Sequence, residues 1–402
     1  MILLLILITF CFSLDISLKD ALRLALKNNR ILKKFERELM SVVYERKRSV
    51  IDRFSPEVDT RFSKDRIELV ARVLLLEFTK RLHNIRAQKE REKIARITLE
   101  EFKNRLKIEV TKLYTSILIY DVYAQELREF MAVSYVRFDR EREKMRLGLS
   151  DRVKVAEWEK TYRYYRSKLL EVQRKYNETL YRLKRYLGIK MEEDLNLKPI
   201  NFKVPEDKSF QEKELLNYVD NNYKLRIKKH EIAYYRELEK GNKRLFFPEL
   251  VLESRLGSKL KDGDTYTELN AYLNIPLFDP AEKFRIKSIK EKVNSLKMEY
   301  EEIKEEVKEK IYTFPYIWDE YIGKYIYAKT NMKWAEENLE LKRSQYELQL
   351  AFDLGYAMAY YTQAERILLE SKLNILLFLM DVYHTLGMNP ERAFQESHFF
   401  LK

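Results

Sequence analysis

The sequence carries one pattern twice, in residues 17–58 and again in residues 209–250. Each copy opens with a serine that has an acidic residue three positions later, which is the signature of a helix N-terminus. An Asn-Asn pair follows, and then a short segment with aromatic residues that leads to a Pro-Glu pair. The matching features are Ser17 with Asp20, Asn28-Asn29 and Phe54 to Val58 in the first copy, and Ser209 with Glu212, Asn221-Asn222 and Phe246 to Leu250 in the second. Because these features keep their order and spacing, they indicate an internal duplication.

Both copies predict the same succession of elements. A helix of about 38 residues ends at a proline that can begin a strand; a turn, a second strand, a very long helix, a break at glycine and a shorter returning helix follow. In the first copy we expect strands at 57–63 and 67–75 with a turn at Asp65-Arg66, and helices at 79–146 and 151–188. In the second copy we expect strands at 249–257 and 266–275 joined by 258–264, and helices at 281–353 and 357–387.

The long helices set the scale of the molecule. The chain has 402 residues but only 8 Gly and 8 Pro, so few residues interrupt a helix. Each long helix would extend roughly 100 Å at the usual rise per residue. Charged residues make up 35% of the chain and hydrophobic residues 46%, which is too apolar for disorder and too charged for a polytopic helical membrane protein. Apolar residues at helical spacing between charges predict coiled-coil-like packing.

The strands are two-faced, as the stretch YTELNAYLNIPLFDP at 266–280 illustrates. A tilted strand of about nine residues that alternates apolar and polar side chains spans a bilayer as part of a barrel. Four strands cannot close a barrel, and open edges are not tolerated in lipid, so several chains would have to share one barrel if the strands lie in a membrane; three chains would give twelve strands. The alternative is a pair of ordinary amphipathic hairpins in a soluble domain. The expected lipid-facing residues are Leu250, Leu252, Leu256, Leu269, Ala271, Leu273 and Ile275.

Residues 1–13 read as a secretory signal peptide. Residues 2–12 are uncharged and apolar over the length of a signal-peptide core, and Cys11 and Ser13 are small residues before a cut after Ser13. Cleavage there leaves a mature chain without cysteine, as suits an exported protein. A lipid-modified Cys11 is disfavoured because the bulky Phe10 precedes it. No later stretch reaches the roughly 18 apolar residues of a membrane helix.

These features together resemble the TolC-like outer-membrane efflux family over residues 16–388. The matching segments are ISLKDALRLALKNN (16–29), SPEV (55–58), RLGLSD (146–151), FPEL (247–250), IPLFDP (275–280) and YHTLGM (383–388). The resemblance implies a homotrimer in which each chain gives four strands to a twelve-stranded outer-membrane barrel, above a hollow helical barrel in the periplasm. It further implies a passive exit duct for small molecules or proteins, joined by a periplasmic adaptor to an inner-membrane pump of the efflux or type I secretion kind.

The resemblance also assigns the helical tips to adaptor contact and closure of the duct. In the first tip Gly148 would permit a tight turn, and Ser150 or Asp151 would cap the returning helix. The alternative for this segment is a plain helix-turn-helix corner. The residues carried over to the first tip are Arg146, Leu147, Gly148, Leu149, Ser150 and Asp151.

The second tip, near 353–357, departs from the family pattern. Leu354-Gly355 would make its turn, but the carboxylates that some members place just after it are absent, and Tyr360 and Tyr361 stand there instead. Asp353 could form a threefold ring at a lumen constriction.

The expected organisation follows from the duplication. We expect a signal peptide at 1–13, repeats at 14–189 and 209–388, a linker at 190–208 where the family has a mid-height belt, and a tail at 389–402. The fold class is therefore mainly α with a small membrane β part.

Nothing in the sequence indicates an enzyme, a metal site or a cofactor. The four histidines are scattered without metal-ligand spacing, and no phosphate-cradling glycine loop or nucleophile elbow occurs. The net charge of +13 is typical of nucleic-acid-binding proteins. However, the basic residues form no local patch, and a signal peptide for export argues against a nucleic-acid partner. A soluble periplasmic scaffold or adaptor is the other alternative, although the chain has neither a lipoyl-like module nor an anchor.

Overall fold

The computed structural model describes residues 14–51, 57–74, 78–242, 249–261, 263–274, 280–348, 353–395 and 397–401. The expected signal peptide at 1–13 and the expected lipid-facing Ile275 lie outside these residues. The chain divides into two compact units, and each unit takes segments from both copies of the repeat. Unit 1 comprises Met1–Arg30, Lys103–Asn217 and Lys310–Lys402, and unit 2 comprises Ile31–Phe102 and Tyr218–Glu309.

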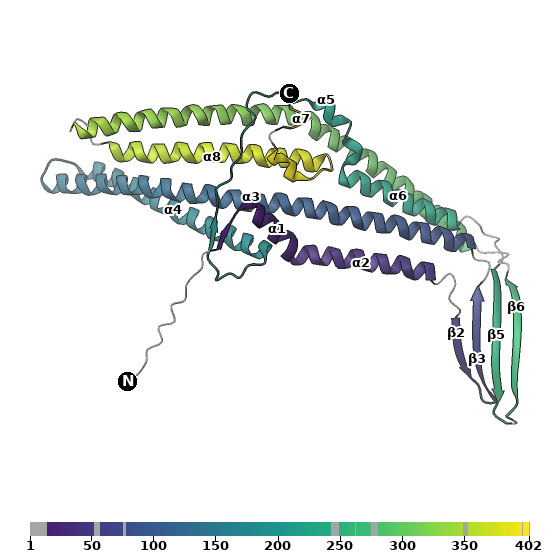
Figure 1. Ribbon diagram of the computed structural model, residues 1–402. Helices are drawn as coiled ribbons and strands as arrows, with labels where there is room; N and C mark the ends of the chain where they lie inside the picture. The colour runs from purple at the N-terminus through teal and green to yellow at the C-terminus, as the bar shows by residue number, and fades with distance from the viewer. Residues whose placement is uncertain are drawn as a thin grey trace, which may run out of the picture. The chain divides into compact units, whose positions relative to one another are not determined.

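The fold is mainly helical, with one sheet of four strands and a small pair of strands (Figure 1). None of the helices in the described residues is both long and apolar enough to cross a membrane. The helices are α1 (Leu18–Asn28), α2 (Arg30–Ile51), α3 (Phe78–Arg146), α4 (Arg152–Leu187), α5 (Glu212–Leu216), α6 (Tyr223–Asn242), α7 (Pro280–Glu347) and α8 (Leu354–Thr385), with the 3-10 helices η1 (Val219–Asn221) and η2 (Pro390–Phe394). The strands are β1 (Leu14–Ile16), β2 (Glu57–Phe62), β3 (Arg66–Leu74), β4 (Leu195–Leu197), β5 (Glu249–Lys259) and β6 (Thr265–Asn274).

The expected 38-residue helices are each interrupted at the Asn-Asn pair. Asn29 leaves the helical conformation between α1 and α2, with φ −60° and ψ 121°. Asn222 does the same before α6, where its Oδ1 accepts a hydrogen bond from the Lys224 backbone N–H at 3.0 Å. Asparagine side chains compete with the helix for backbone hydrogen bonds, which explains the breaks. Both breaks lie at or near a boundary between units 1 and 2.

The two expected helix-capping serines behave differently. The Ser17 Oγ accepts the Asp20 backbone N–H at 3.2 Å and caps α1. Helix α5 instead begins after Gln211, which makes no side-chain cap. The backbone N–H of Gln211 donates to the Phe400 carbonyl at 2.8 Å, so a contact with the C-terminal tail replaces the local capping signal of Ser209.

The four-stranded sheet lies in unit 2 and has the order β2-β3-β5-β6, with every neighbouring pair antiparallel. The hairpin β2-β3 comes from the first copy of the repeat and the hairpin β5-β6 from the second. The two hairpins meet where β3 pairs with β5 at the centre of the sheet. The first turn comprises residues 63–65, where the Ser63 N–H donates to the Arg66 carbonyl at 2.9 Å. The expected turn at Asp65-Arg66 is therefore wrong, because Arg66 already pairs with Lys259.

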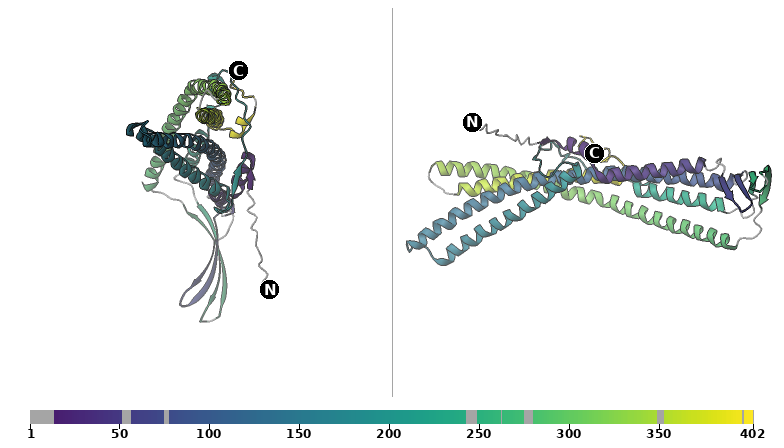
Figure 2. Two further views of the ribbon diagram at one scale, coloured as in Figure 1. Left: turned by 90° about the vertical axis from the view of Figure 1, so that its left-hand side faces the viewer. Right: turned by 90° about the horizontal axis from the view of Figure 1, so that it is seen from below.

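Unit 1 packs its four long helical segments in the order α4, α3, α8, α7. A buried cluster of Ala124, Leu127, Leu169 and Val172 joins α3 to α4. The Arg366 Nε donates to Glu126 at 2.5 Å and joins α8 to α3. Phe314 and Phe378 meet edge to face at 5.6 Å and join α7 to α8. Both helical hairpins are seen lengthwise in the right-hand view of Figure 2.

The linker and the C-terminal tail close the core of unit 1. Phe210, just after the linker, pairs with Leu401 of the tail in a β-bridge and packs against Trp318 and Phe400. The buried Tyr114 hydroxyl donates to the carbonyls of Ile16 and Lys198 and holds the β1–β4 pair.

Candidate functional site

One face of the four-stranded sheet is apolar. The ladder places Leu250 opposite Leu273 and Leu252 opposite Ala271, so these side chains share a face. Leu256 and Leu269 belong to the same face, and Leu269 is 76% exposed. The six expected lipid-facing residues that the structure describes are thus on one side of the sheet. Such a large exposed apolar surface requires a partner, either protein or lipid.

The opposite face of the sheet is polar and internally paired. Glu253 lies near its centre, with its side chain only 4% exposed. It accepts hydrogen bonds from Arg72 Nε and Arg255 Nε, each at 2.5 Å. Asp59 lies 3.7 Å from Arg72, and the Tyr272 hydroxyl lies 3.4 Å from Glu253. This network spans all four strands. No turn connects β3 to β5, and charge-assisted bonds hold this central pair together instead.

A glycine makes room for a second link across the centre of the sheet. The Tyr266 hydroxyl of β6 donates to Glu68 of β3, and so its ring passes over Gly257 of the intervening strand β5. A Cβ on Gly257 would lie 2.4 Å from that ring. The sequence reveals no role for Gly257, because the cause is a contact between residues 198 positions apart.

Both edges of this sheet are open within the described chain. Strand β2 pairs only with β3, and β6 pairs only with β5. In Figure 2 the four strands run together as one twisted ribbon. An edge strand exposes a row of unpaired N–H and C=O groups that another strand can pair with.

The first tip is a compact glycine turn between α3 and α4. The Leu149 N–H donates to the Lys144 carbonyl at 2.8 Å and the Gly148 N–H donates to the Met145 carbonyl at 3.0 Å, which is the Schellman arrangement. Gly148 has a φ of +75°, the left-handed conformation that this turn requires. Asp151 then caps α4 by accepting the Lys154 N–H at 2.9 Å. Gly148 and Asp151 therefore have the local conformations expected from the sequence.

The same turn presents apolar side chains to its surroundings. Leu147 and Leu149 are each 74% exposed. Ser150 does not cap a helix and instead donates to Glu141 at 2.8 Å. Hydrogen bonds from Lys144 and Ser150 hold the pKa of Glu141 below its ordinary value. Arg146 pairs with Glu143 one turn earlier in α3. The tip is thus a rigid polar turn with two exposed leucines.

The second tip differs from its expected form. Leu354 and Gly355 do not make the turn, because α8 begins at Leu354 and both lie in its first helical turn. Gly355 serves close packing instead, since a Cβ there would lie 2.7 Å from Val133 Cγ2 of α3. The prediction of a turn at these residues is therefore wrong, and residues 349–352, which precede them, lie outside the described chain.

An arginine joins the two hairpins of unit 1 near this tip. Arg137 of α3 forms an ion pair with Asp353. Its guanidinium also lies 4.6 Å from the ring centre of Tyr356 in α8 and 5.0 Å from that of Trp158 in α4. Asp353 thus has a partner inside its own chain, and its place in a constriction stays a prediction. No local pattern in the sequence predicts that Arg137 connects three helices.

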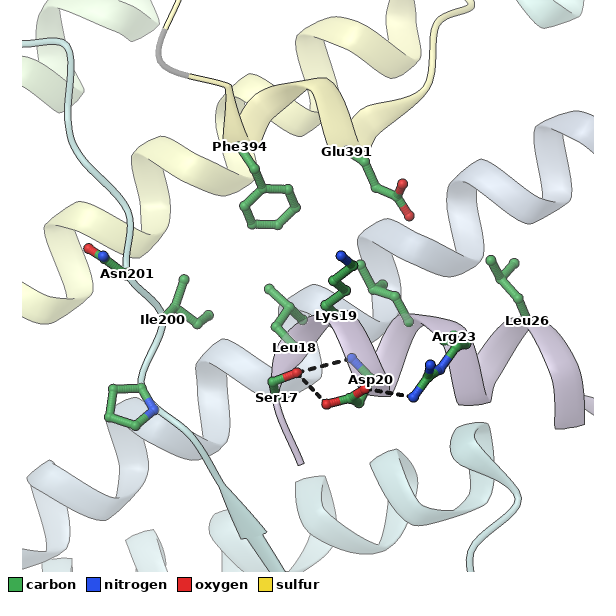
Figure 3. Close-up of a pocket in the computed structure, with 12 residues that line it drawn as sticks. Ser17, Leu18, Lys19, Asp20, Arg23, Leu26, Ile200, Asn201, Glu391 and Phe394 are labelled. Carbon is green, nitrogen blue, oxygen red and sulfur yellow. Dashed lines mark hydrogen bonds and ion pairs between the residues drawn. The ribbon is translucent and has the colours of Figure 1, made fainter. Parts of the chain in front are cut away.

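A groove lies beside α1 in unit 1 (Figure 3). It has a volume of about 830 Å³ and is lined by α1, residues 199–201 of the linker, and η2. Its charged side chains are largely paired within the chain, as Arg23 is with Asp20 and Glu391 is with Lys107. In the described part of the chain no three His, Cys, Asp or Glu residues gather to hold a metal ion.

No protein-family model and no curated protein matches the sequence. Solved structures match over nearly the whole chain. A membrane protein from Pseudomonas aeruginosa is 15% identical, with a TM-score of 0.75, over 94% of this chain and 92% of that one. The CmeC outer membrane channel of Campylobacter jejuni is 14% identical, with a TM-score of 0.75, over 95% and 87%. The outer membrane protein VceC from Vibrio cholerae is 12% identical, with a TM-score of 0.71, over 92% and 96%. The chain therefore has the fold of the TolC-like outer-membrane channels, and the resemblance of its motifs to that family is confirmed at the level of the fold.

Proposed function

We propose that the chain is one protomer of a trimeric outer-membrane exit duct. The observation that carries the proposal is a sheet with one apolar face, one polar face and two open edges. Lipid would cover the apolar face, and neighbouring copies would pair the edges, because no backbone group can remain unpaired in a bilayer. The solved outer-membrane channels with the same fold support this assignment. The remaining helical mass would lie in the periplasm.

The helical layer of unit 1 supports assembly from several copies. Its order leaves α4 and α7 at the two edges, and each edge helix exposes several large apolar residues. Head-to-tail contact between unlike edges closes a ring when the rotation per copy permits it. The exposed residues are Tyr164, Leu170 and Tyr181 on α4, and Tyr327, Trp334 and Leu341 at heptad spacing in an apolar stripe on α7.

Charge favours contact between these two unlike edges. Helix α4 carries eleven Lys and Arg residues against four Glu. Beside the apolar stripe of α7 the exposed Glu336, Glu340 and Glu347 alternate with the exposed Lys333 and Arg343, so this edge is close to neutral. Like charge disfavours contact between two α4 helices and leaves the near-neutral α7 edge as the better partner. We therefore expect α4 of one copy to pack on α7 of the next.

Chemical cross-linking of the sheet edges tests the shared barrel. In a Cys11→Ser background, Thr60→Cys on β2 and Ala271→Cys on β6 are combined, and membranes are treated with a bis-maleimide. The proposal expects a ladder that ends at three chains, whereas either single variant should give no ladder, because β2 would meet only β6. A double variant that stays monomeric in membranes would contradict the shared barrel.

The first tip is the proposed contact for a periplasmic adaptor that links the duct to an inner-membrane pump. Exposed leucines on a rigid turn can be buried by a partner without ordering a loop. We expect Leu147→Glu with Leu149→Glu to leave folding intact and to weaken adaptor binding at least tenfold, measured by pull-down from cross-linked cells. Met298→Glu, at an equally exposed residue in unit 2, is the control. Unchanged adaptor binding by the tip variant would contradict this contact.

A further inference from the structure

Two histidine–glutamate pairs join α3 and α6 in unit 2. The His83 Nδ1 lies 2.7 Å from Glu237 Oε2, and the His230 Nδ1 lies 2.6 Å from Glu90 Oε2. Each helix supplies one histidine and one glutamate, seven residues apart. The pairs are thus reciprocal, and they repeat after two helical turns on antiparallel helices.

These pairs are partly shielded from water. The side chains of His83 and Glu237 are 13% and 16% exposed, and those of His230 and Glu90 are 25% and 16% exposed. Ion pairs of limited exposure are screened less by salt and solvent than those on an open surface. A change in the charge of either imidazole is therefore felt by the carboxylate it faces.

Each glutamate has one further basic partner, a lysine on its own helix. Glu90 binds Lys93 at 2.7 Å, and Glu237 binds Lys240 at 2.8 Å. Burial by itself would raise the pKa of Glu90, but hydrogen bonds from Lys93 and His230 outweigh it and hold that pKa below its ordinary value. The pKa of Glu237 is lowered in the same way against burial, by Lys240 and His83. Both carboxylates therefore stay ionised in mild acid.

The other helices of unit 2 direct their charges to different residues. Helix α2 supplies Arg46 to Glu92 and Glu45 to Arg91 on α3. Helix α7 supplies Glu299 to Lys228, which also binds Glu231 on its own helix. Lys93 and Lys240 are charged groups that contact the two His–Glu pairs directly.

We propose that the two pairs form a clasp between α3 and α6 that tightens when the surroundings become acidic. Histidine is the side chain that gains a positive charge between pH 8 and pH 5. A protonated imidazole that faces a carboxylate makes a charge-assisted bond between opposite charges, which is stronger than the bond from a neutral ring. Acid thus favours the docked helices.

The clasp joins the two helices that adjoin the central strands of the sheet in the sequence. Helix α3 begins shortly after β3, and α6 ends shortly before β5. These are the two central strands, which come from different copies of the repeat and have no turn between them. Docking of α3 on α6 therefore holds together the two helices that adjoin these strands in the sequence. The inference concerns unit 2 alone and does not depend on the duct function.

Hydrogen exchange of the full purified chain tests the clasp. Exchange of peptides from residues 81–102 and from α6 is compared at pH 8 and pH 5.5 after correction for intrinsic exchange. We expect opening to be about tenfold rarer at pH 5.5, as two partly buried pairs of ordinary strength would give. Peptides from α4, which contains no histidine, are the internal control. Equal protection at both pH values would overturn the proposal.

Two double variants separate the charge from the shape of the imidazole. His83→Gln with His230→Gln keeps hydrogen bonding but cannot be charged, so it should show weak protection at both pH values. His83→Lys with His230→Lys is charged throughout, so it should show strong protection at both. A pH response that survives in either double variant would overturn the proposal, and the wild-type comparison needs no variant to fold.

Discussion

Single glycines show most clearly the difference between residues required by local conformation and residues required by tertiary contacts. Gly148 adopts a left-handed φ, which a glycine between two helical patterns predicts. Gly257 and Gly355 have no such local signal. Each is required because another chain segment comes too close for a Cβ, a tyrosine ring in one case and Val133 in the other. Both contacts are made by a side chain on another strand or helix, so no pattern around either glycine could reveal them.

At this scale we predict opposite outcomes for two helical glycines of unit 1. Gly355→Ala should lower the free energy of unfolding by about 1–3 kcal/mol, because its Cβ would overpack against Val133. Gly323→Ala in α7 should be neutral or stabilising by up to about 1 kcal/mol, because nothing lies within 4 Å of its Cβ. Thermal unfolding of the two purified variants in one detergent makes the comparison. Equal melting temperatures would contradict the packing role of Gly355.

The elements were predictable wherever their pattern was long. Helices of 69 and 68 residues and the two-faced strands follow from periodicity that many residues share. The predictions failed for short elements, as at the Asn-Asn breaks and at the second tip, because one or two side chains determine the local structure there. The register of β3 against β5 could not be predicted, since no turn connects them. It depends on Arg72, Glu253 and Tyr266, whose partners lie on other strands.

The sheet gives a prediction about Gly257. Gly257→Ala should displace Tyr266 and break its hydrogen bond to Glu68, so that the β3–β5 register loses one of its two cross-repeat links. We expect a loss of about 1–3 kcal/mol in stability and a lower yield of protein in the membrane. Tyr266→Phe is the matched variant, because it removes the hydroxyl but leaves the ring in place. If Gly257→Ala assembles as well as wild type, Tyr266 does not set the register.

The contact between the two hairpins of unit 1 gives a prediction about closure. Arg137→Ala should release Asp353 and remove the stacking on Trp158 and Tyr356, so the hairpins separate more readily. In planar bilayers we expect several-fold higher conductance. Arg142→Ala is the control, because Arg142 pairs with Asp139 and lies over the Phe138 ring, both on its own helix. Equal conductance of the two variants would show that Arg137 does not restrain the tip.

The C-terminal tail should respond to acid in the opposite sense from the clasp. Burial lowers the pKa of the His398 ring to about 4, and the nearby Lys208 acts in the same direction. A depressed pKa means that the folded state binds fewer protons than the unfolded state. The stability is therefore present above about pH 6.5 and is lost as the pH falls toward 4.

We expect this loss to be roughly 2–3 kcal/mol by pH 4, as linkage gives for a pKa lowered from 6.5 to about 4. Melting temperatures of wild type and His398→Gln between pH 7 and pH 4 measure it. The variant should melt lower at pH 7, since Tyr383 loses its ring partner, but should lose less than wild type in acid. Parallel pH curves would show that His398 does not carry the acid sensitivity.

The whole molecule is organised by its duplication. Each copy contributes one hairpin to the sheet and one long helical hairpin to unit 1, and within the described chain both edges of the sheet remain open. A sequence repeat predicts this division, because two similar halves must place their apolar faces against each other or against further copies. The number of copies follows from the strand count only once the sheet is placed in lipid.

Membrane fractionation tests the central claim most directly. The chain is expressed with its own N-terminal segment in a Gram-negative host, and the inner and outer membranes are separated by density. The duct account predicts recovery in the outer membrane, with release only by detergent, because lipid covers the apolar face of the sheet. Recovery in the soluble periplasm would contradict it, since that face would then be covered by protein and the chain would be a scaffold.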